Sequence, residues 1–147
     1  MRYDFSGEIE TTVAWWVKQL REQPKADAGS VTIESFYAFF TAAHERPSEA
    51  AIGRFEVTLY NWLGYLLNAK KPCYEEPWGD LMIASRNAWT ALSTDYTLQG
   101  DLKSIAEHTG IPLYCFPIKS YTSIYPGAVI ARLGYSGKEE VIYRKGA

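Results

Sequence analysis

The feature that most constrains the fold is a change in the spacing of apolar residues near Gly110. Before this glycine, apolar side chains recur every three or four positions, which is the spacing of one face of an α-helix. After it, β-branched and aromatic residues alternate between turn residues, as they do in β-strands. Helices followed by strands favour the α+β class over alternating α/β folds. The sequence therefore predicts about four helices followed by a small antiparallel β-meander.

The expected helices have recognisable ends. Ser6 and Ser48 are placed as N-caps of the first and longest helices, and Gly110 is placed as the C′ residue of the last. The longest helix has a second apolar flank formed by Val57, Tyr60 and Leu67, which predicts that it is covered on more than one side. The predicted helices cover 8–23, 32–45, 48–69 and 97–109.

The expected strands are bounded by prolines and glycines. Pro126-Gly127 suits the two central positions of a type II turn, and Pro117 ends an apolar segment. The predicted strands cover 81–85, 113–116, 121–125, 128–133 and 140–144, and 89–92 is left open between helix and strand. No repeat or linker interrupts the chain, so 1–147 is expected to form one domain. Its helical part covers about 6–69 and 97–109, and its sheet part covers about 81–85 and 111–145.

Composition excludes several classes of partner. Fifteen Lys and Arg against seventeen Asp and Glu give a net charge of −2, and no basic run offers attraction to nucleic-acid phosphates. The longest apolar run, 62–67, is far shorter than the roughly 20 residues of a membrane span. The N-terminal residues lack the apolar core of a secretory signal. We therefore expect no nucleic-acid or membrane partner, and a cytoplasmic location.

The nucleophilic and metal-ligating residues form no catalytic pattern. Cys115 lies in an apolar segment, as a small buried hydrophobe does, and Cys73 has no His or Asp neighbour. His44 and His108 each lie near the C-terminus of an expected helix, where positive charge is favourable. No Cys-x-x-Cys, His-x-x-x-His or Asp cluster is present. We predict no catalytic residue, metal or cofactor, and keep a cysteine-dependent enzyme as an alternative.

Aromatic residues, at 15% of the chain, are the clearest excess. Trp15 falls off the apolar stripe of the first helix, and Tyr74 and Trp78 lie in a loop with two prolines. Tyr121 and Tyr125 share one face of a strand by their spacing of four. Tyr and Trp are enriched in interfaces because they bury a large area and keep a polar group. These five residues are the predicted protein-binding residues.

An aromatic excess without a catalytic pattern favours a non-catalytic cytosolic protein-binding domain. We expect an inhibitor, immunity or anti-defence type of protein that acts by docking a partner protein. A small-molecule binder, with an aromatic-lined pocket between helices and sheet, is an alternative. The sequence leaves the partner's identity and homodimer formation open.

The segment from Phe116 to Gly134 resembles the second signature box of the BTG/Tob family of antiproliferative adaptors. That box runs as Leu-Pro, then an Asp-Pro turn nine residues on, then Val, Arg and Gly at fixed spacing. The order of expected elements along the chain is also similar to that of the family. The matching positions here are Phe116-Pro117, Ile124-Tyr125-Pro126, Val129, Arg132 and Gly134.

The chain also departs from the family's two boxes. Lys71-Pro72-Cys73 is similar to the first box loop, but the Gly-Ser-x-Tyr-Arg that follows in the family is absent. The spacer that leads to the second box is four residues shorter here. The resemblance implies a second alternative, a non-catalytic adaptor that recruits a deadenylase. The family's Trp, Asp and Glu of the second box correspond to Ser123, Tyr125 and Ala128.

Overall fold

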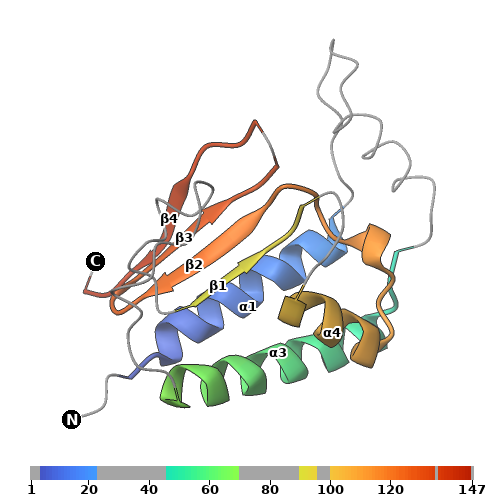
Figure 1. The fold of residues 1–147 in the computed structure, drawn as a ribbon, viewed down its shortest axis with the longest axis horizontal. Coiled ribbons are helices and arrows are strands. Elements are labelled where there is room, and N and C mark those ends of the chain that lie inside the picture. Colours follow the sequence, from blue (N-terminus) through green and yellow to red (C-terminus); the bar gives the residue numbers. More distant parts are fainter. Residues whose placement is uncertain (1–3, 23–45, 70–89, 96–99, 135, 147) are drawn as a thin grey trace.

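A layer of helices lies against one face of an antiparallel sheet (Figure 1). The computed structural model describes residues 4–22, 46–69, 90–95, 100–134 and 136–146. Within these ranges the prediction of the α+β class is confirmed. The elements are α1 (Ser6–Arg21), α3 (Glu49–Ala69), β1 (Thr90–Ser93), α4 (Gly100–Thr109), the 3-10 helix η2 (Leu113–Cys115), β2 (Tyr121–Tyr125), β3 (Ala128–Arg132) and β4 (Glu140–Arg144).

The N-terminus of α1 is held by Asp4 rather than by the expected cap, Ser6. Asp4 Oδ1 accepts hydrogen bonds from the backbone N–H of Ser6, at 3.0 Å, and from the Ser6 hydroxyl. The bond from the Ser6 hydroxyl is the main reason why the pKa of Asp4 lies below its usual value. Ser6 is therefore the first residue of the helix, because an ionised carboxylate beside it is the better acceptor for an N-terminal N–H group.

The C-terminus of α1 is held by Arg46. Its Nη2 lies 3.1, 2.7 and 2.8 Å from the carbonyl oxygens of Gln19, Leu20 and Glu22, and 3.4 Å from that of Cys115. The last carbonyls of a helix have no partner within the helix, so a cation there supplies donors and opposes the negative end of the dipole. Arg46 thereby joins α1 to η2.

The caps expected for the other helices are confirmed. Ser48 Oγ accepts a hydrogen bond from the backbone N–H of Ala51 at 3.1 Å, at the start of α3. Gly110 has φ +77 after α4, and the N–H of Ile111 donates to the carbonyl of Ala106 at 2.9 Å. A residue with positive φ and a bond of this span are typical of a Schellman C-cap. The segments 32–45, 81–85 and 97–99, also predicted as helix or strand, lie outside the described residues.

The sheet has the strand order β1-β2-β3-β4, with every neighbouring pair antiparallel. The predicted meander is confirmed, and β3 ends at Arg132, one residue before the expected end. Gly127 has φ +91 in the turn between β2 and β3, as the Pro-Gly pair predicts. The open segment 89–92 contributes β1, which pairs with β2.

The prediction of a strand over 113–116 is wrong. The N–H of Cys115 donates to Pro112 at 3.0 Å and that of Phe116 donates to Leu113 at 3.2 Å, which are the bonds of a 3-10 turn. Pro112 and Pro117 flank the segment and have no N–H to give to a ladder. Both edges of β2 are already paired, with β1 and with β3, so the segment packs its side chains without joining the sheet.

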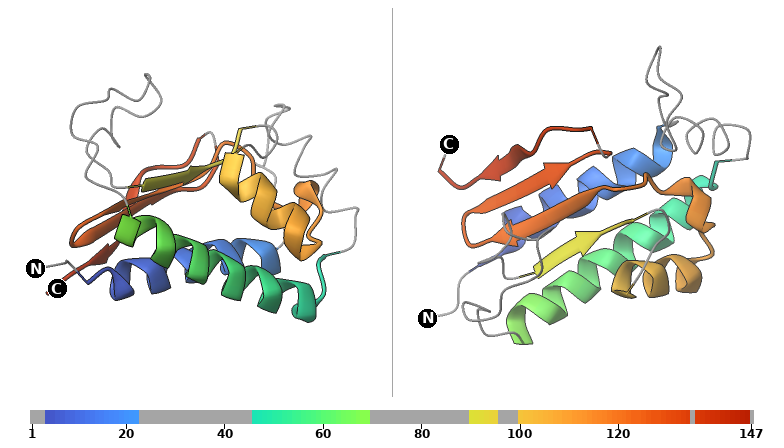
Figure 2. Two further views of the ribbon diagram at one scale, coloured as in Figure 1. Left: turned by 60° about the horizontal axis from the view of Figure 1, so that its bottom comes forward. Right: turned by 45° about the horizontal axis from the view of Figure 1, so that its top comes forward.

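The core lies between the two layers. Trp16 of α1, Phe55 of α3 and Phe116 meet there, with ring centroids 6.4 Å apart for Trp16–Phe116 and 5.5 Å apart for Phe55–Phe116. The indole N–H of Trp16 donates to Thr122 Oγ1 of β2 at 2.8 Å, so this buried polar group is satisfied. Figure 2 shows α1 and α3 side by side beneath the sheet, with α4 near β1. None of the helices in the described ranges is long and apolar enough to cross a membrane.

Candidate functional site

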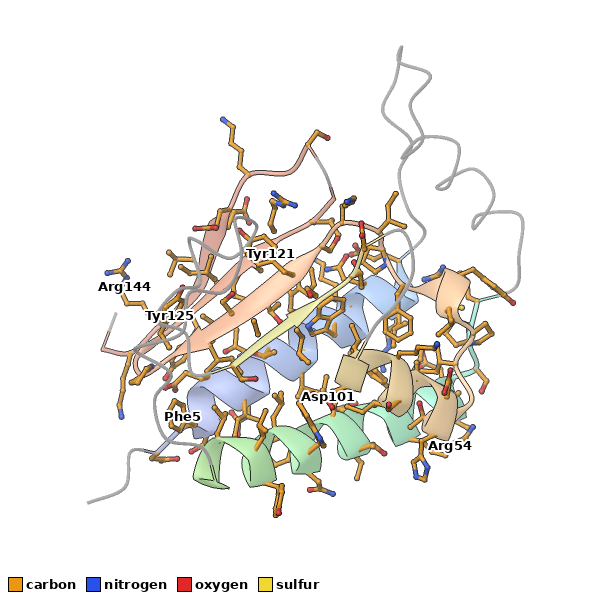
Figure 3. All side chains as sticks on the ribbon, in the orientation of Figure 1. Phe5, Arg54, Asp101, Tyr121, Tyr125 and Arg144 are labelled. Atoms are coloured by element: carbon orange, nitrogen blue, oxygen red, sulfur yellow. The ribbon has the colours of Figure 1, made fainter. Side chains whose placement is uncertain are left out.

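One face of the sheet is turned away from α1, α3 and α4. Side chains alternate along a strand, so Tyr121 and Tyr125 lie on the face opposite to Thr122, which contacts Trp16. Cross-strand pairing continues this outer face onto β3 and β4, and Figure 3 labels both tyrosines and Arg144 on the sheet. We call this surface the tyrosine face. Its residues are Tyr121, Tyr125, Ile130, Arg132, Val141 and Arg144.

Tyr121 is held in place by two side chains. Its hydroxyl donates a hydrogen bond to the carboxylate of Glu139, and Arg132 Cζ lies 5.1 Å from the centroid of its ring. Burial, followed by the bond to Glu139 and its charge, raises the pKa of Tyr121 to about 12, against an opposing effect of Arg132. Arg132 is itself positioned, because its Nη2 donates to the carbonyl of Lys119 at 3.3 Å. The Tyr121 side chain is therefore uncharged at neutral pH, and its ring is held in one orientation.

The positions that correspond to the family's Trp, Asp and Glu also lie on this face. Ser123 stands between the two tyrosines and is fully buried, and Tyr125 and Ala128 are half-buried. Tyr125 and Ala128 are a cross-strand pair beside the β2–β3 turn. At these three positions the chain therefore has a serine, a tyrosine and an alanine, where the family has an indole and two carboxylates.

The other predicted binding residues do not join the tyrosine face. Trp15 is half-buried on α1, and its ring meets that of Trp16 edge-on, with centroids 4.8 Å apart and an interplanar angle of 84°. It packs against the core from the helical layer, on the opposite side of the sheet. Tyr74 and Trp78 lie outside the described residues.

The surroundings of Cys115 and His108, the cysteine and the histidine among the described residues, are those of structural residues. Cys115 is buried, and burial raises the pKa of its thiol, with Arg46 opposing the shift. The thiol is therefore protonated at neutral pH, as expected for a small buried hydrophobe. His108 is exposed in the last turn of α4. No group of three or more His, Cys, Asp or Glu that could hold a metal ion occurs among the described residues. Cys73 and His44 lie outside them.

The prediction that the second apolar flank of the longest helix is covered is confirmed for Leu67, which is buried, and is wrong for Val57 and Tyr60. Val57 is 60% exposed and Tyr60 is 41% exposed, on the side of α3 where shallow hollows of about 290 and 330 Å³ lie against α1. The spacing of apolar residues identifies this flank in the sequence. Only the position of α1 beside α3, which the structure shows, explains why Val57 and Tyr60 stay in solvent. These hollows lie among helices, whereas the predicted ligand pocket lay between helices and sheet.

No family model and no curated protein matches the sequence. Among solved structures, the chain is similar to the BTG/Tob domain of C. elegans FOG-3, solved in a doubly substituted form. The TM-score is 0.55 and the sequence identity is 19%, and the match covers 94% of this chain and 89% of that chain. Similarity at this identity shows a shared fold. The chain has the fold of a BTG/Tob domain, as the resemblance of residues 116–134 to the second signature box implied.

Proposed function

We propose that this protein is a non-catalytic adaptor that binds a partner protein through the tyrosine face. The observation that carries the proposal is the placement of Tyr121 and Tyr125, both half-buried, on the side of the sheet opposite to the helices. Tyrosines bury a large area with few rotatable bonds, and their hydroxyl groups tolerate water when no partner is bound. The likeness to a BTG/Tob domain supports the adaptor class.

The tyrosine face has the properties of a preorganised contact. Glu139 and Arg132 hold Tyr121 in one orientation, which lowers the entropy lost on binding. Beside it, Val141 is 49% exposed and offers apolar area, and Arg144 is exposed and offers hydrogen-bond donors. An aromatic centre with an arginine at its edge is a common composition of interface hot spots.

Two kinds of partner fit this proposal. A deadenylase is the partner implied by the resemblance to the BTG/Tob boxes, whose positions 123, 125 and 128 lie on this face. An enzyme or toxin blocked by docking is the partner of an inhibitor, immunity or anti-defence protein. We favour the adaptor because the fold supports it. We propose that it is a single cytoplasmic domain that uses neither nucleic acid nor a cofactor.

The test compares affinity capture by the double variant Tyr121→Ala/Tyr125→Ala with capture by Tyr65→Ala. Tyr65 is the matched control because it is 75% exposed on α3, away from the sheet. We expect the double variant to bind at least about tenfold more weakly, or about 1.4 kcal/mol, and the control to bind normally. Purified deadenylase is measured in parallel, since its binding separates the two kinds of partner. Equal capture by both variants would contradict the proposal.

We extend the contact surface to Tyr74 and Trp78 of the proline-bounded loop. Prolines at 72 and 77 restrict the chain and lower the entropy lost on docking. We expect Trp78→Ala to weaken partner binding at least about tenfold with the melting temperature unchanged. A loss of about 3–5 kcal/mol of stability, the range for emptying a buried tryptophan site, would remove this loop from the proposal. Trp15 is the least favoured of the proposed binding residues, because its packing on Trp16 predicts that its truncation lowers the stability of the fold.

A further inference from the structure

A groove runs between α1 and α3 on the side of the helical layer that faces away from the sheet. On α1, Glu10 and Ala14 are exposed, whereas Thr12 and Trp16, about half a turn away, are buried toward the sheet. The groove consists of two adjoining hollows, of about 290 and 330 Å³, and both are lined by Ala14 and Glu56. We call this surface the helix groove. The residues used below are Glu10, Val13, Ala14, Glu56, Val57 and Tyr60.

The helix groove is apolar at one end, in the hollow that contains Val57 and Tyr60. Val13 and Ala14 of α1 contribute its floor, and Val57 and Tyr60 of α3 stand beside them with 60% and 41% of their surfaces in solvent. Contiguous apolar area of this kind on a soluble protein marks an interaction site more often than chance. The lining runs from Glu10 to Glu22, about 18 Å at 1.5 Å per residue, which equals a little over three turns of a docked helix.

Within the described residues, some charged side chains at the groove have an ion-pair partner and others have none. Lys18 pairs with Glu22 at 4.0 Å, and Arg21 pairs with Glu49 at 3.1 Å. In the described part of the chain no ion pair involves Glu10 or Glu56, although both line the hollow that contains Val57 and Tyr60. The apolar end of the groove is therefore bordered by two carboxylates that have no cationic partner there. This charge pattern attracts lysine or arginine and rejects acidic segments.

We propose that the helix groove binds an amphipathic helix of a partner protein, with one apolar stripe and Lys or Arg residues flanking that stripe. A helix laid in a groove presents apolar residues at every third or fourth position, which suits the strip formed by Val13, Val57 and Tyr60. Its flanking cations pair with Glu10 and Glu56. This site is separate from the tyrosine face, because the sheet and the buried side of α1 lie between them.

The probe is a synthetic peptide of about 18 residues, or five helical turns, with leucine at every third or fourth position and lysine elsewhere. A peptide with glutamate in place of lysine is its counterpart. Binding to the full chain is followed by fluorescence anisotropy and mapped by amide chemical shifts. We expect the lysine peptide to bind, the glutamate peptide to bind at least tenfold more weakly, and the shifts to centre on α1 and on 56–61 of α3.

Protein variants test whether the contact is specific. Glu10→Lys/Glu56→Lys is expected to weaken binding of the lysine peptide at least tenfold, and Val57→Ser is expected to weaken its binding at least threefold. Glu107→Lys/Glu140→Lys is the matched control, because it makes the same change in net charge at two exposed carboxylates elsewhere. Tyr121→Ala/Tyr125→Ala is expected to leave peptide binding unchanged, so this site and the proposed function fail independently.

Four results would overturn the inference. If Glu10→Lys/Glu56→Lys and the matched control lost the same peptide affinity, the peptide would be held by diffuse attraction between opposite net charges. Equal binding of the glutamate peptide would exclude a basic partner. Chemical shifts centred on β2, β3 and β4 would place the peptide on the sheet. Self-association that is abolished by Val57→Ser, measured by sedimentation, would assign the groove to a second copy of this chain.

Discussion

Single side chains supply hydrogen-bond partners at the ends of the helices, and Arg46 contacts several carbonyl oxygens at once. Its Nη2 lies within hydrogen-bonding distance of three carbonyls at the end of α1 and of the carbonyl of Cys115. Arg54 offers a comparison, because it is exposed and makes one long bond, at 3.4 Å, to the carbonyl of Thr109 at the end of α4. The number and length of the contacts, rather than the charge itself, should decide what each arginine contributes.

Arg46→Ala should lower the free energy of unfolding by about 2–3 kcal/mol, since buried carbonyls lose a charged donor. Arg54→Ala, the matched control, should change it by less than about 0.5 kcal/mol. Urea denaturation followed by circular dichroism measures both values. Equal effects of the two substitutions would show that Arg46 is not the cap of α1.

Cys115→Ser should reduce stability by about 1 kcal/mol, because a hydroxyl replaces a thiol in the core, and it should leave partner binding intact. Cys73→Ser should also retain full activity. The raised pKa of the Cys115 thiol further predicts slow alkylation by iodoacetamide in the folded protein at pH 8. A folded double serine variant that had lost activity would favour the cysteine-dependent enzyme instead.

Tyr121 should make stability sensitive to alkaline pH. Its pKa is about 12 in the folded protein against 10 ordinarily, so its contribution is present below pH 10 and is lost as the pH rises through about 12. Absorbance titration near 295 nm should show a transition near pH 12 that Tyr121→Phe removes. Glu139→Gln should move that transition toward pH 10, and an unmoved transition would contradict the role of Glu139.

At the scale of elements, the sequence predicted those whose signals are local. α3, the end of α4 and the β2–β3 hairpin each carry their own cap or turn residue, at Ser48, Gly110 and Gly127. β1 and η2 were not predicted, because their conformation depends on which strand occupies the edge of β2. No local pattern distinguishes an apolar segment that joins that edge from one that packs beside it.

Gly127→Ala tests the hairpin as an element. Its φ of +91 disfavours any residue with a Cβ, so the substitution should cost about 1–2 kcal/mol of stability. Gly53→Ala is the matched control, because a Cβ there would meet nothing within 4 Å and Gly53 lies inside α3. It should stabilise the protein by about 0.5–1 kcal/mol. Thermal unfolding of both variants gives the comparison, and effects of the same sign would contradict it.

At the scale of the whole molecule, α1 joins the parts that are far apart in sequence. It packs on α3 and also contacts β2, β3 and β4. The candidate site was predicted as far as Tyr121 and Tyr125, because a spacing of four within a strand fixes a shared face. Trp15 lies on α1, on the other side of the sheet from these two tyrosines, and only the two-layer arrangement shows this separation. The helix groove was likewise missed, because it needs two helices placed side by side.

Glu8 connects α1 to the turn between β2 and β3. Its side chain is fully buried, and its Oε2 accepts the N–H of Gly127, 119 residues later, at 3.1 Å. Burial, followed by the charge of Glu8, also raises the pKa of Tyr143 on β4. One carboxylate thus ties the N-terminal helix to the C-terminal hairpin.

Glu8→Ala should therefore lower the free energy of unfolding by about 1–3 kcal/mol, because it leaves the Gly127 N–H without its acceptor. It should also speed hydrogen exchange at the Gly127 amide, which reports the hairpin directly. Glu10→Ala, two residues on and exposed, should change stability by less than about 0.5 kcal/mol and leave that exchange rate unaltered. Glu8→Gln keeps an acceptor oxygen and should fall between the two. If Glu8→Ala matched Glu10→Ala in both measurements, α1 would hold the hairpin through apolar packing alone.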